Sequence, residues 1–173
     1  MIVADCFLPN KHFYRNATMK RKEALVQDLM TTEVITVSPT DTLSLAFFLF
    51  HANSIRHLPI VEKGKRIVGM ISEIDIKRML GPIQNESQLI EHSGWYRQLK
   101  GKHVDIFVRK RVPRIKPDLA VSHAAKLMLR NKISALPVEN KRKLVGIITE
   151  TDILREYIKI CNQPTPKTKR KKA

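Results

Sequence analysis

One seven-residue pattern occurs twice in this chain of 173 residues, and this repetition limits the fold more than any other feature. The segments "GMISEID" (69–75) and "GIITETD" (146–152) both contain a glycine, two apolar residues, a hydroxyl, an acid, a variable position and an aspartate. The similarity continues on the N-terminal side, so that residues 34–76 match 112–153 with a single residue gained or lost between "EKGKR" and "ENKRK". Such self-similarity indicates two copies of one structural unit.

Each copy is predicted to contain a strand, a helix, two strands and a second helix. "VITVSP" is β-branched and ends in proline, and residues 42–53 and 120–131 have apolar residues at helical spacing. "HLPIVE" with "RIVGMI", and "ALPVE" with "KLVGII", bracket polar turns and predict hairpins, which places the length difference in a turn. The last helix of each copy is predicted to begin at Ser72 or Thr149. The predicted fold class is therefore α/β, with two β-α-β-β-α repeats packed as a pseudo-symmetric pair.

The first helix of the first copy has apolar residues around most of its circumference. Leu43, Ala46, Phe47 and Phe50 form one face, and Leu45, Phe48 and Leu49 form another. A helix that is apolar nearly all round is buried on both sides. Two interpretations remain open, namely packing between the two repeats and a homodimer surface.

Composition indicates a protein with a sizeable core and a strong positive charge. With 43% hydrophobic residues the chain can bury a core, and the formal net charge of +16 favours polyanionic partners. Cys6 and Cys161 have no metal-type spacing, and no N-terminal segment resembles a signal peptide or a membrane span. We therefore expect a reduced, cytoplasmic protein without a membrane anchor.

The doubled "IRHLPIV…VGMISEID" and "ISALPVE…VGIITETD" resemble a tandem pair of cystathionine-beta-synthase (CBS) domains, also called a Bateman module. The stand-alone layout is also similar to that of acetoin-utilisation regulatory proteins. The resemblance implies a division of the chain into five segments: an N-terminal extension (1–23), a first repeat (24–81), a linker (82–102), a second repeat (103–160) and a basic C-terminal tail (161–173).

The heptapeptide has two interpretations. A glycine permits close approach of a ligand, and a hydroxyl caps a helix whose free amides favour a phosphate. The resemblance implies that Ser72 and Thr149 contact phosphate and that Asp75 and Asp152 hold a ribose. Alternatively, Ser-x-x-Asp and Thr-x-x-Asp are capping boxes that need no ligand. Glu73 and Glu150 favour this second interpretation, because carboxylates in the first helical turn repel a phosphate.

The resemblance further implies two clefts, each combining a helix start from one repeat with strand residues from the other. Thr149 and Asp152 are expected to face a set from the first repeat: Ser38, Ile55, Arg56, His57, Leu58 and Pro59. Ser72 and Asp75 are expected to face a set from the second: Lys116, Ile133, Ser134, Ala135 and Pro137. Because Arg56 and His57 bring a charge and a titratable donor, we expect the Thr149/Asp152 cleft to be the stronger phosphate site.

We therefore predict a regulatory, non-enzymatic module that binds an adenine nucleotide (AMP, ADP or ATP) and signals to an unknown regulated protein. No nucleophile motif, metal-ligand spacing or phosphate-binding glycine loop is present in the sequence, and no cofactor or metal is expected. Basic runs at 18–23, 97–116 and 167–173 support two alternatives. One is non-specific binding of RNA or DNA, with Trp95 and Tyr96 beside the central run, and the other is an interaction protein without a ligand.

Overall fold

The computed structural model describes residues 23–80, 99, 101–108 and 112–162. Almost all of the predicted N-terminal extension, most of the linker with Trp95 and Tyr96, and most of the basic tail lie outside the described residues.

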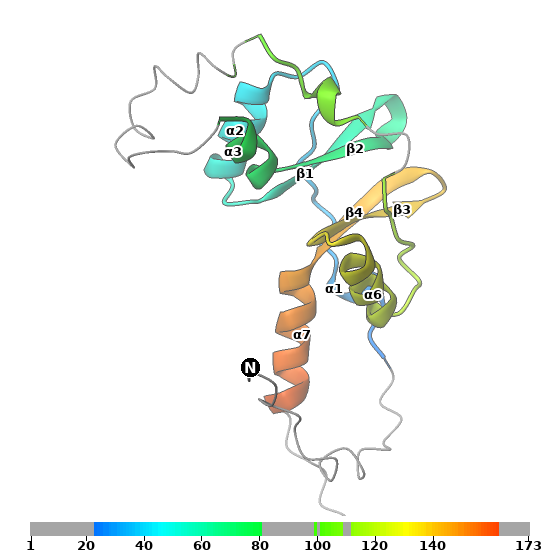
Figure 1. Cartoon of the computed structure of the whole chain (residues 1–173). Coiled ribbons are helices and arrows are strands. Elements are labelled where there is room, and N and C mark those ends of the chain that lie inside the picture. Colours follow the sequence, from blue (N-terminus) through cyan, green and yellow to red (C-terminus); the bar gives the residue numbers. More distant parts are fainter. Residues whose placement is uncertain (1–22, 81–98, 100, 109–111, 163–173) are drawn as a thin grey trace, which may run out of the picture.

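The two repeats have the same order of helices and strands (Figure 1). The elements of the first repeat are α2 (Leu43–Ala52), β1 (His57–Glu62), the 3-10 turn η1 (Lys63–Lys65), β2 (Arg66–Ser72) and α3 (Glu73–Leu80). Those of the second repeat are α6 (Val121–Asn131), β3 (Ala135–Asn140), β4 (Lys143–Thr149) and α7 (Glu150–Asn162). A short helix begins each repeat, α1 (Val26–Leu29) in the first and the 3-10 helix η2 (Val104–Phe107) in the second. The predicted α/β class is confirmed.

The two hairpins form as predicted. β1 and β2 pair antiparallel from His57 opposite Ser72 to Glu62 opposite Arg66, and β3 and β4 pair from Ala135 opposite Thr149 to Asn140 opposite Lys143. Three residues connect the first pair and two connect the second, so the single-residue length difference lies in this turn. Each hairpin leads directly into a helix that starts one residue after the last strand residue.

The prediction of an extended strand at 34–39 is wrong. One parallel bridge joins Val37 to Ile60, and its counterpart in the second repeat joins Ile115 to Val138. The amide of Ser38 donates instead to Oδ2 of Asp41, 2.7 Å away. Because this amide is taken by a local turn, the chain leaves the sheet directly after Val37.

The short segments at the starts of the two repeats are exchanged between them. α1 begins the first repeat but packs in the core of the second, where Val26 is fully buried and its amide donates to the Leu119 carbonyl over 2.8 Å. η2 begins the second repeat but packs in the core of the first, and the amide of Val104 donates to the Asp41 carbonyl over 2.9 Å. Each core therefore includes a segment that belongs, in sequence, to the other repeat.

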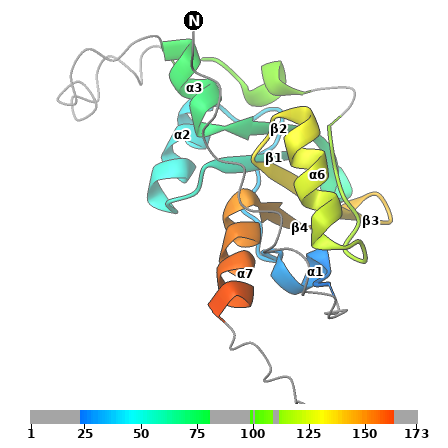
Figure 2. The same ribbon diagram turned by 60° about the horizontal axis from the view of Figure 1, so that its bottom comes forward.

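The two hairpins face each other across an apolar contact. Ile67 of β2 and Leu144 of β4 form a buried cluster with Val112, and Val34 and Met70 pack at its edge. Figure 2 shows the two hairpins in the middle of the molecule, with α2 and α3 beside the first hairpin. The pair is therefore joined through its strands.

The second apolar face of α2 is not covered by the second repeat. Leu43, Ala46 and Phe50 are buried in the first core as predicted, but Phe48 is 63% exposed. The interpretation that this face packs between the repeats is therefore wrong for Phe48, because the contact between repeats is made by β2 and β4.

Candidate functional site between the two repeats

A cavity of about 1010 Å³ lies between the two repeats. Ser72 and Asp75 at the start of α3 form part of its wall. Ile133, Ser134 and Ala135, which connect α6 to β3, form another part. The structure thus brings together the helix start of the first repeat and the strand start of the second.

The start of α3 is held by a reciprocal capping box. The carboxylate Oδ2 of Asp75 accepts hydrogen bonds from the amide of Ser72 at 2.9 Å and from its hydroxyl at 2.5 Å, while the amide of Asp75 donates to Ser72 Oγ at 3.3 Å. The capping interpretation is therefore confirmed here. The capping box engages Oδ2 of Asp75. Among the described residues, no hydrogen bond or ion pair involves Oδ1 of Asp75.

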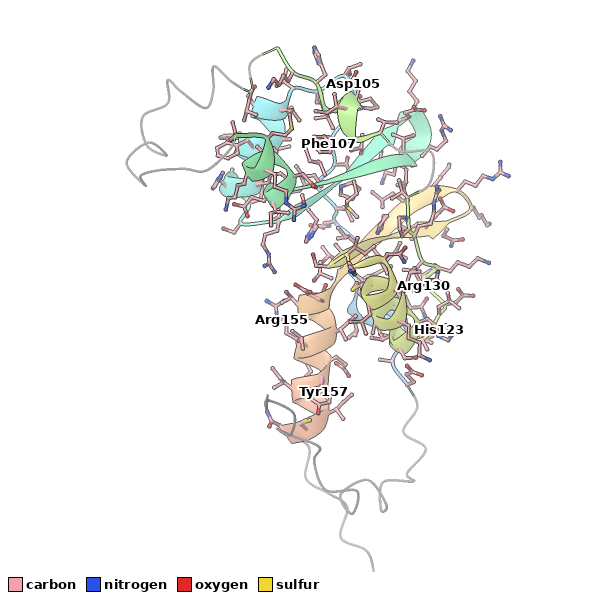
Figure 3. All side chains as sticks on the ribbon, viewed as in Figure 1. Asp105, Phe107, His123, Arg130, Arg155 and Tyr157 are labelled. Carbon is pink, nitrogen blue, oxygen red and sulfur yellow. The ribbon has the colours of Figure 1, made fainter. Side chains whose placement is uncertain are left out.

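The start of α7 has the same box. Oδ2 of Asp152 accepts from the amide of Thr149 at 2.8 Å and from its hydroxyl at 2.7 Å. Here, however, Oδ1 lies 3.9 Å from the guanidinium of Arg155, which Figure 3 labels near the start of α7. Thr149 and Asp152 do not line the cavity between the repeats.

The glycines of the two heptapeptides make room for the exchanged segments, which corrects the expectation that they make room for a ligand. A Cβ at Gly69 would lie 2.6 Å from Cδ1 of Ile60 on the paired strand and 2.7 Å from the backbone oxygen of Phe107, a residue that Figure 3 labels beside β2. A Cβ at Gly146 would lie 2.6 Å from Met30 Sδ and 3.0 Å from the backbone oxygen of Thr31. The glycine of the heptapeptide occurs in both copies because each hairpin is packed against a segment from the start of the other repeat.

Arg56 and His57 do not act together at the Thr149/Asp152 cleft as expected. Arg56 Nη2 donates to Thr151 Oγ1 over 3.3 Å, so this guanidinium does lie at the first turn of α7. His57 instead lines the cavity with Ser72, and its Nε2 lies 2.9 Å from Ser134 Oγ. Arg56 lies in the bend that precedes β1 and His57 is the first residue of the strand, and their side chains contact different partners.

The environment of His57 favours the neutral imidazole. Burial, reinforced by the adjacent Arg56 guanidinium, lowers the pKa of His57 below its ordinary value. The carboxylates of Glu150 and Asp75 oppose this shift without reversing it. His57 therefore serves the cavity as a neutral hydrogen-bonding group near pH 7.

The cavity carries charges of both signs. Arg78 of α3 and Lys132 at the C-terminus of α6 line it, as do Asp75 and Glu150. Glu73, the other acid that was expected to repel a phosphate, is paired with Lys77 at 2.7 Å and does not line the cavity. Arg78 lies one helical turn after Asp75, a spacing from which the sequence could have identified it.

The remaining predicted residues lie away from this cavity. Leu58, Pro59 and Pro137 are buried in the sheets, Ile55 packs against the first core, Ser38 belongs to the local turn with Asp41, and Lys116 is exposed. Sequence reasoning missed the apolar part of the wall, because most of these side chains come from helix faces without a distinctive motif. It consists of Met70, Ile74, Ala125, Met128, Leu129, Ile153 and Leu154 together with Val112 and Pro113.

Within the part of the chain that the structure describes, no three His, Cys, Asp or Glu residues form a group that could hold a metal ion. None of the described helices is long and apolar enough to span a bilayer.

A family model provides the decisive comparison. The model of the CBS domain matches residues 26–81 and 104–159, the two repeats described above. The chain belongs to the CBS domain family. Its two α/β repeats are therefore a pair of CBS domains.

Two relatives match this CBS pair over nearly their whole length. A CBS domain-containing protein of Dictyostelium discoideum is 30% identical over 149 residues, which is 83% of this chain and 97% of that protein. Protein MJ1426 of Methanocaldococcus jannaschii is 29% identical over 155 residues and is covered to 91%. The inosine-5'-monophosphate dehydrogenase of the same organism is 32% identical, but the match covers 24% of that enzyme.

Solved structures show the same fold. The CBS domain pair of protein MJ0100, in complex with 5'-methylthioadenosine and S-adenosyl-L-methionine, has a TM-score of 0.65 at 28% identity and covers 80% of this chain and 98% of that one. The Vibrio cholerae protein AcuB, named for acetoin utilization, has a TM-score of 0.63 at 29% identity and covers 80% and 93%. The resemblance to stand-alone pairs of the acetoin-utilisation type is thus confirmed.

Proposed function

We propose that this CBS pair is a regulatory module that binds an adenosyl ligand in the cavity between the repeats. The observation that carries the proposal is the meeting of Asp75, at the start of α3, with Ile133, Ser134 and Ala135 of the other repeat around one cavity. A cavity of about 1010 Å³ is at the upper end of the size range of small-molecule sites. The complex of the MJ0100 pair with two adenosyl compounds supports the ligand class.

Asp75 is the residue that we assign to the ribose. Its Oδ2 is held by the capping box, which fixes the carboxylate, and its Oδ1 has no partner among the described residues. A carboxylate oxygen accepts hydrogen bonds from hydroxyl groups, such as the two of a ribose. At Asp152 the corresponding oxygen lies beside Arg155, so ribose binding there has to compete with an existing ion pair. We therefore propose the Ser72/Asp75 cleft, and not the Thr149/Asp152 cleft, as the principal site.

The apolar wall suits the base. Met128 of α6, Ile133 of the segment that follows α6, and Ile153 and Leu154 of α7 lie on this wall and provide apolar surface. Burial of an adenine ring against such side chains is favourable in proportion to the apolar area removed from water. His57 and Ser134 provide polar groups in the same cavity.

The experiment that tests the proposal compares two matched variants. Asp75→Asn and Asp152→Asn remove the same charge from equivalent capping boxes, so we expect similar changes in ligand-free stability. Methylthioadenosine at a hundred times its dissociation constant should stabilise the wild type by about 2.7 kcal/mol, which thermal unfolding detects. We expect this stabilisation to be lost in Asp75→Asn and kept in Asp152→Asn. Equal loss in both variants would refute the assignment of the site.

The charged groups of the cavity predict how ligands of different charge are ranked. Arg78 and Lys132 favour the phosphate of AMP, whereas Glu150 and Asp75 favour the cationic sulfonium of S-adenosylmethionine, and methylthioadenosine carries no charge. Arg78→Gln should therefore weaken AMP and leave methylthioadenosine unchanged. Glu150→Gln should strengthen AMP and weaken S-adenosylmethionine. Isothermal titration of the three ligands against the two variants distinguishes the adenine nucleotides from the other adenosyl compounds.

The regulatory part of the proposal depends on the fact that both repeats contribute residues to the wall of the cavity. A ligand that contacts α3 of one repeat and the start of β3 of the other favours one arrangement of the two repeats, since it binds that arrangement more tightly. We propose that a regulated protein, or the second protomer of a homodimer, detects this arrangement. The enzymes among the relatives support such a role, because in them the matched region is a minor part of a longer chain.

A further inference from the structure

The turns of the two hairpins lie side by side at the same end of the two sheets (Figure 1). A groove of about 520 Å³ runs between them. Glu62 and Arg66 of the first hairpin line it, and so do Glu139 and Arg142 of the second. Arg114, which precedes α6 in the second repeat, is the fifth charged residue of the lining. We call this region the paired-turn surface.

The paired-turn surface is strongly cationic. Its two carboxylates are already paired, Glu62 with Arg66 and Glu139 with Arg114. The remaining charged groups of the turns are exposed cations: Lys63, Lys65, Lys141, Arg142 and Lys143. Seven cationic side chains thus gather around two carboxylates, from segments that are far apart in the sequence.

The two cations of the second turn occupy backbone positions that do not favour long side chains. Lys141 and Arg142 have φ values of 48° and 64°, as the two-residue connection of this hairpin requires. Asn-Gly is the favoured pair in such a turn, because positive φ is costly for residues with a long side chain. In the first turn, Lys65 also has a positive φ of 64°. Strain of this kind is characteristic of functional positions.

We propose that the paired-turn surface binds the phosphate backbone of double-stranded nucleic acid. Arginines bind phosphate with paired hydrogen bonds, and lysines supply mobile positive charge. Apart from Val108, the large exposed hydrophobic residues of the described chain do not line this groove, whereas a protein partner would be expected to bury an apolar or aromatic centre. No aromatic residue among those described lines the groove, and single strands are normally held by stacking on such residues. This activity is separate from the adenosyl site.

The test uses a variant that removes two cations and at the same time relieves the turn. Lys141→Asn/Arg142→Gly places the favoured pair at the positive-φ positions, so we expect its melting temperature to be equal to or above that of the wild type. Its affinity for a 20-base-pair duplex at 0.1 M salt should fall by on the order of tenfold or more. The log-log salt slope should become shallower by about 0.9 for each phosphate that the variant no longer neutralises.

The matched control removes the same two charges elsewhere. Lys126 and Arg130 are exposed on α6, where Figure 3 labels Arg130, and neither lines the groove. Lys126→Gln/Arg130→Gln in the full chain should keep both the affinity and the salt slope. Fluorescence anisotropy of a labelled duplex measures both quantities.

Three results would overturn the proposal. The first is equal behaviour of the two double variants, which would attribute binding to net charge or to the basic tail. The second is tighter binding of a single strand of the same sequence than of the duplex. The third is competition by polyglutamate as effective as that by unlabelled duplex at equal charge concentration, which would point to an acidic protein.

Discussion

The imidazole Nε2 of His57 lies 2.9 Å from the hydroxyl of Ser134, which links the first residue of β1 to the residue that precedes β3. It is a polar contact between the repeats, as is that of Arg56 with Thr151, whereas the contact between β2 and β4 is apolar. Because the environment of His57 lowers its pKa, this contact is sensitive to pH.

The first prediction concerns the pH dependence of stability. A histidine whose folded pKa is lowered binds a proton more readily in the unfolded chain. The free energy of unfolding should therefore fall as pH decreases through about 6.5, and it should level off below the folded pKa. His57→Gln keeps a hydrogen-bonding group but cannot titrate, so its stability should fall less over pH 7.5 to 5.5 in urea denaturation. Parallel curves for the two proteins would contradict the prediction.

The second prediction concerns the heptapeptide glycines. Gly69→Ala should lower the free energy of unfolding by about 1 to 3 kcal/mol, because the added methyl group meets the buried side chain of Ile60 and the backbone oxygen of Phe107. Gly146→Ala should cost less, since the flexible thioether of Met30 can move aside. As a control, the cost of Gly146→Ala should be smaller in a Met30→Ala background, as a double-mutant cycle would show. Equal costs at the two glycines would argue against the exchanged segments as the cause.

The third prediction concerns the capping boxes. Ser72→Ala and Thr149→Ala each remove the hydroxyl that accepts from the Asp75 or Asp152 amide, and each should cost about 1 kcal/mol of stability without ligand. Chemical denaturation followed by circular dichroism measures this cost. A change well below about 0.5 kcal/mol in both variants would show that the boxes contribute little.

The fourth prediction concerns assembly. Phe48 is 63% exposed and Leu45 is 40% exposed on the same helix, an apolar patch of the kind that marks interfaces. We expect a homodimer at micromolar concentration, and Phe48→Asp should shift it toward the monomer of 19.9 kDa. Light scattering gives the mass directly. Because the side chain is exposed, the variant should keep its melting temperature when both proteins are compared as monomers at high dilution.

The sequence by itself determined the local structure of this protein. The range 57–62 predicted for a strand is the range of β1. The difference of one residue between the copies lies in the hairpin turn, as the sequence predicted. The Ser-x-x-Asp and Thr-x-x-Asp patterns form capping boxes in both copies. Such features depend on neighbours a few residues away, and local chemistry specifies them.

Only the tertiary structure decided how the repeats share their parts. The exchange of α1 and η2 explains the two glycines, and it depends on contacts between segments such as Met30 and Gly146 that no local pattern encodes. The same holds for the cavity: the two repeats have nearly identical motifs, yet Ser72 and Asp75 line it and Thr149 and Asp152 do not. The physical reason is that packing between distant segments depends on the side chains of both partners. His57 has Ala135 at the equivalent position of the other copy, and Arg78 and Arg155 are equivalent in sequence, yet Arg78 lines the cavity while Arg155 lies beside Asp152.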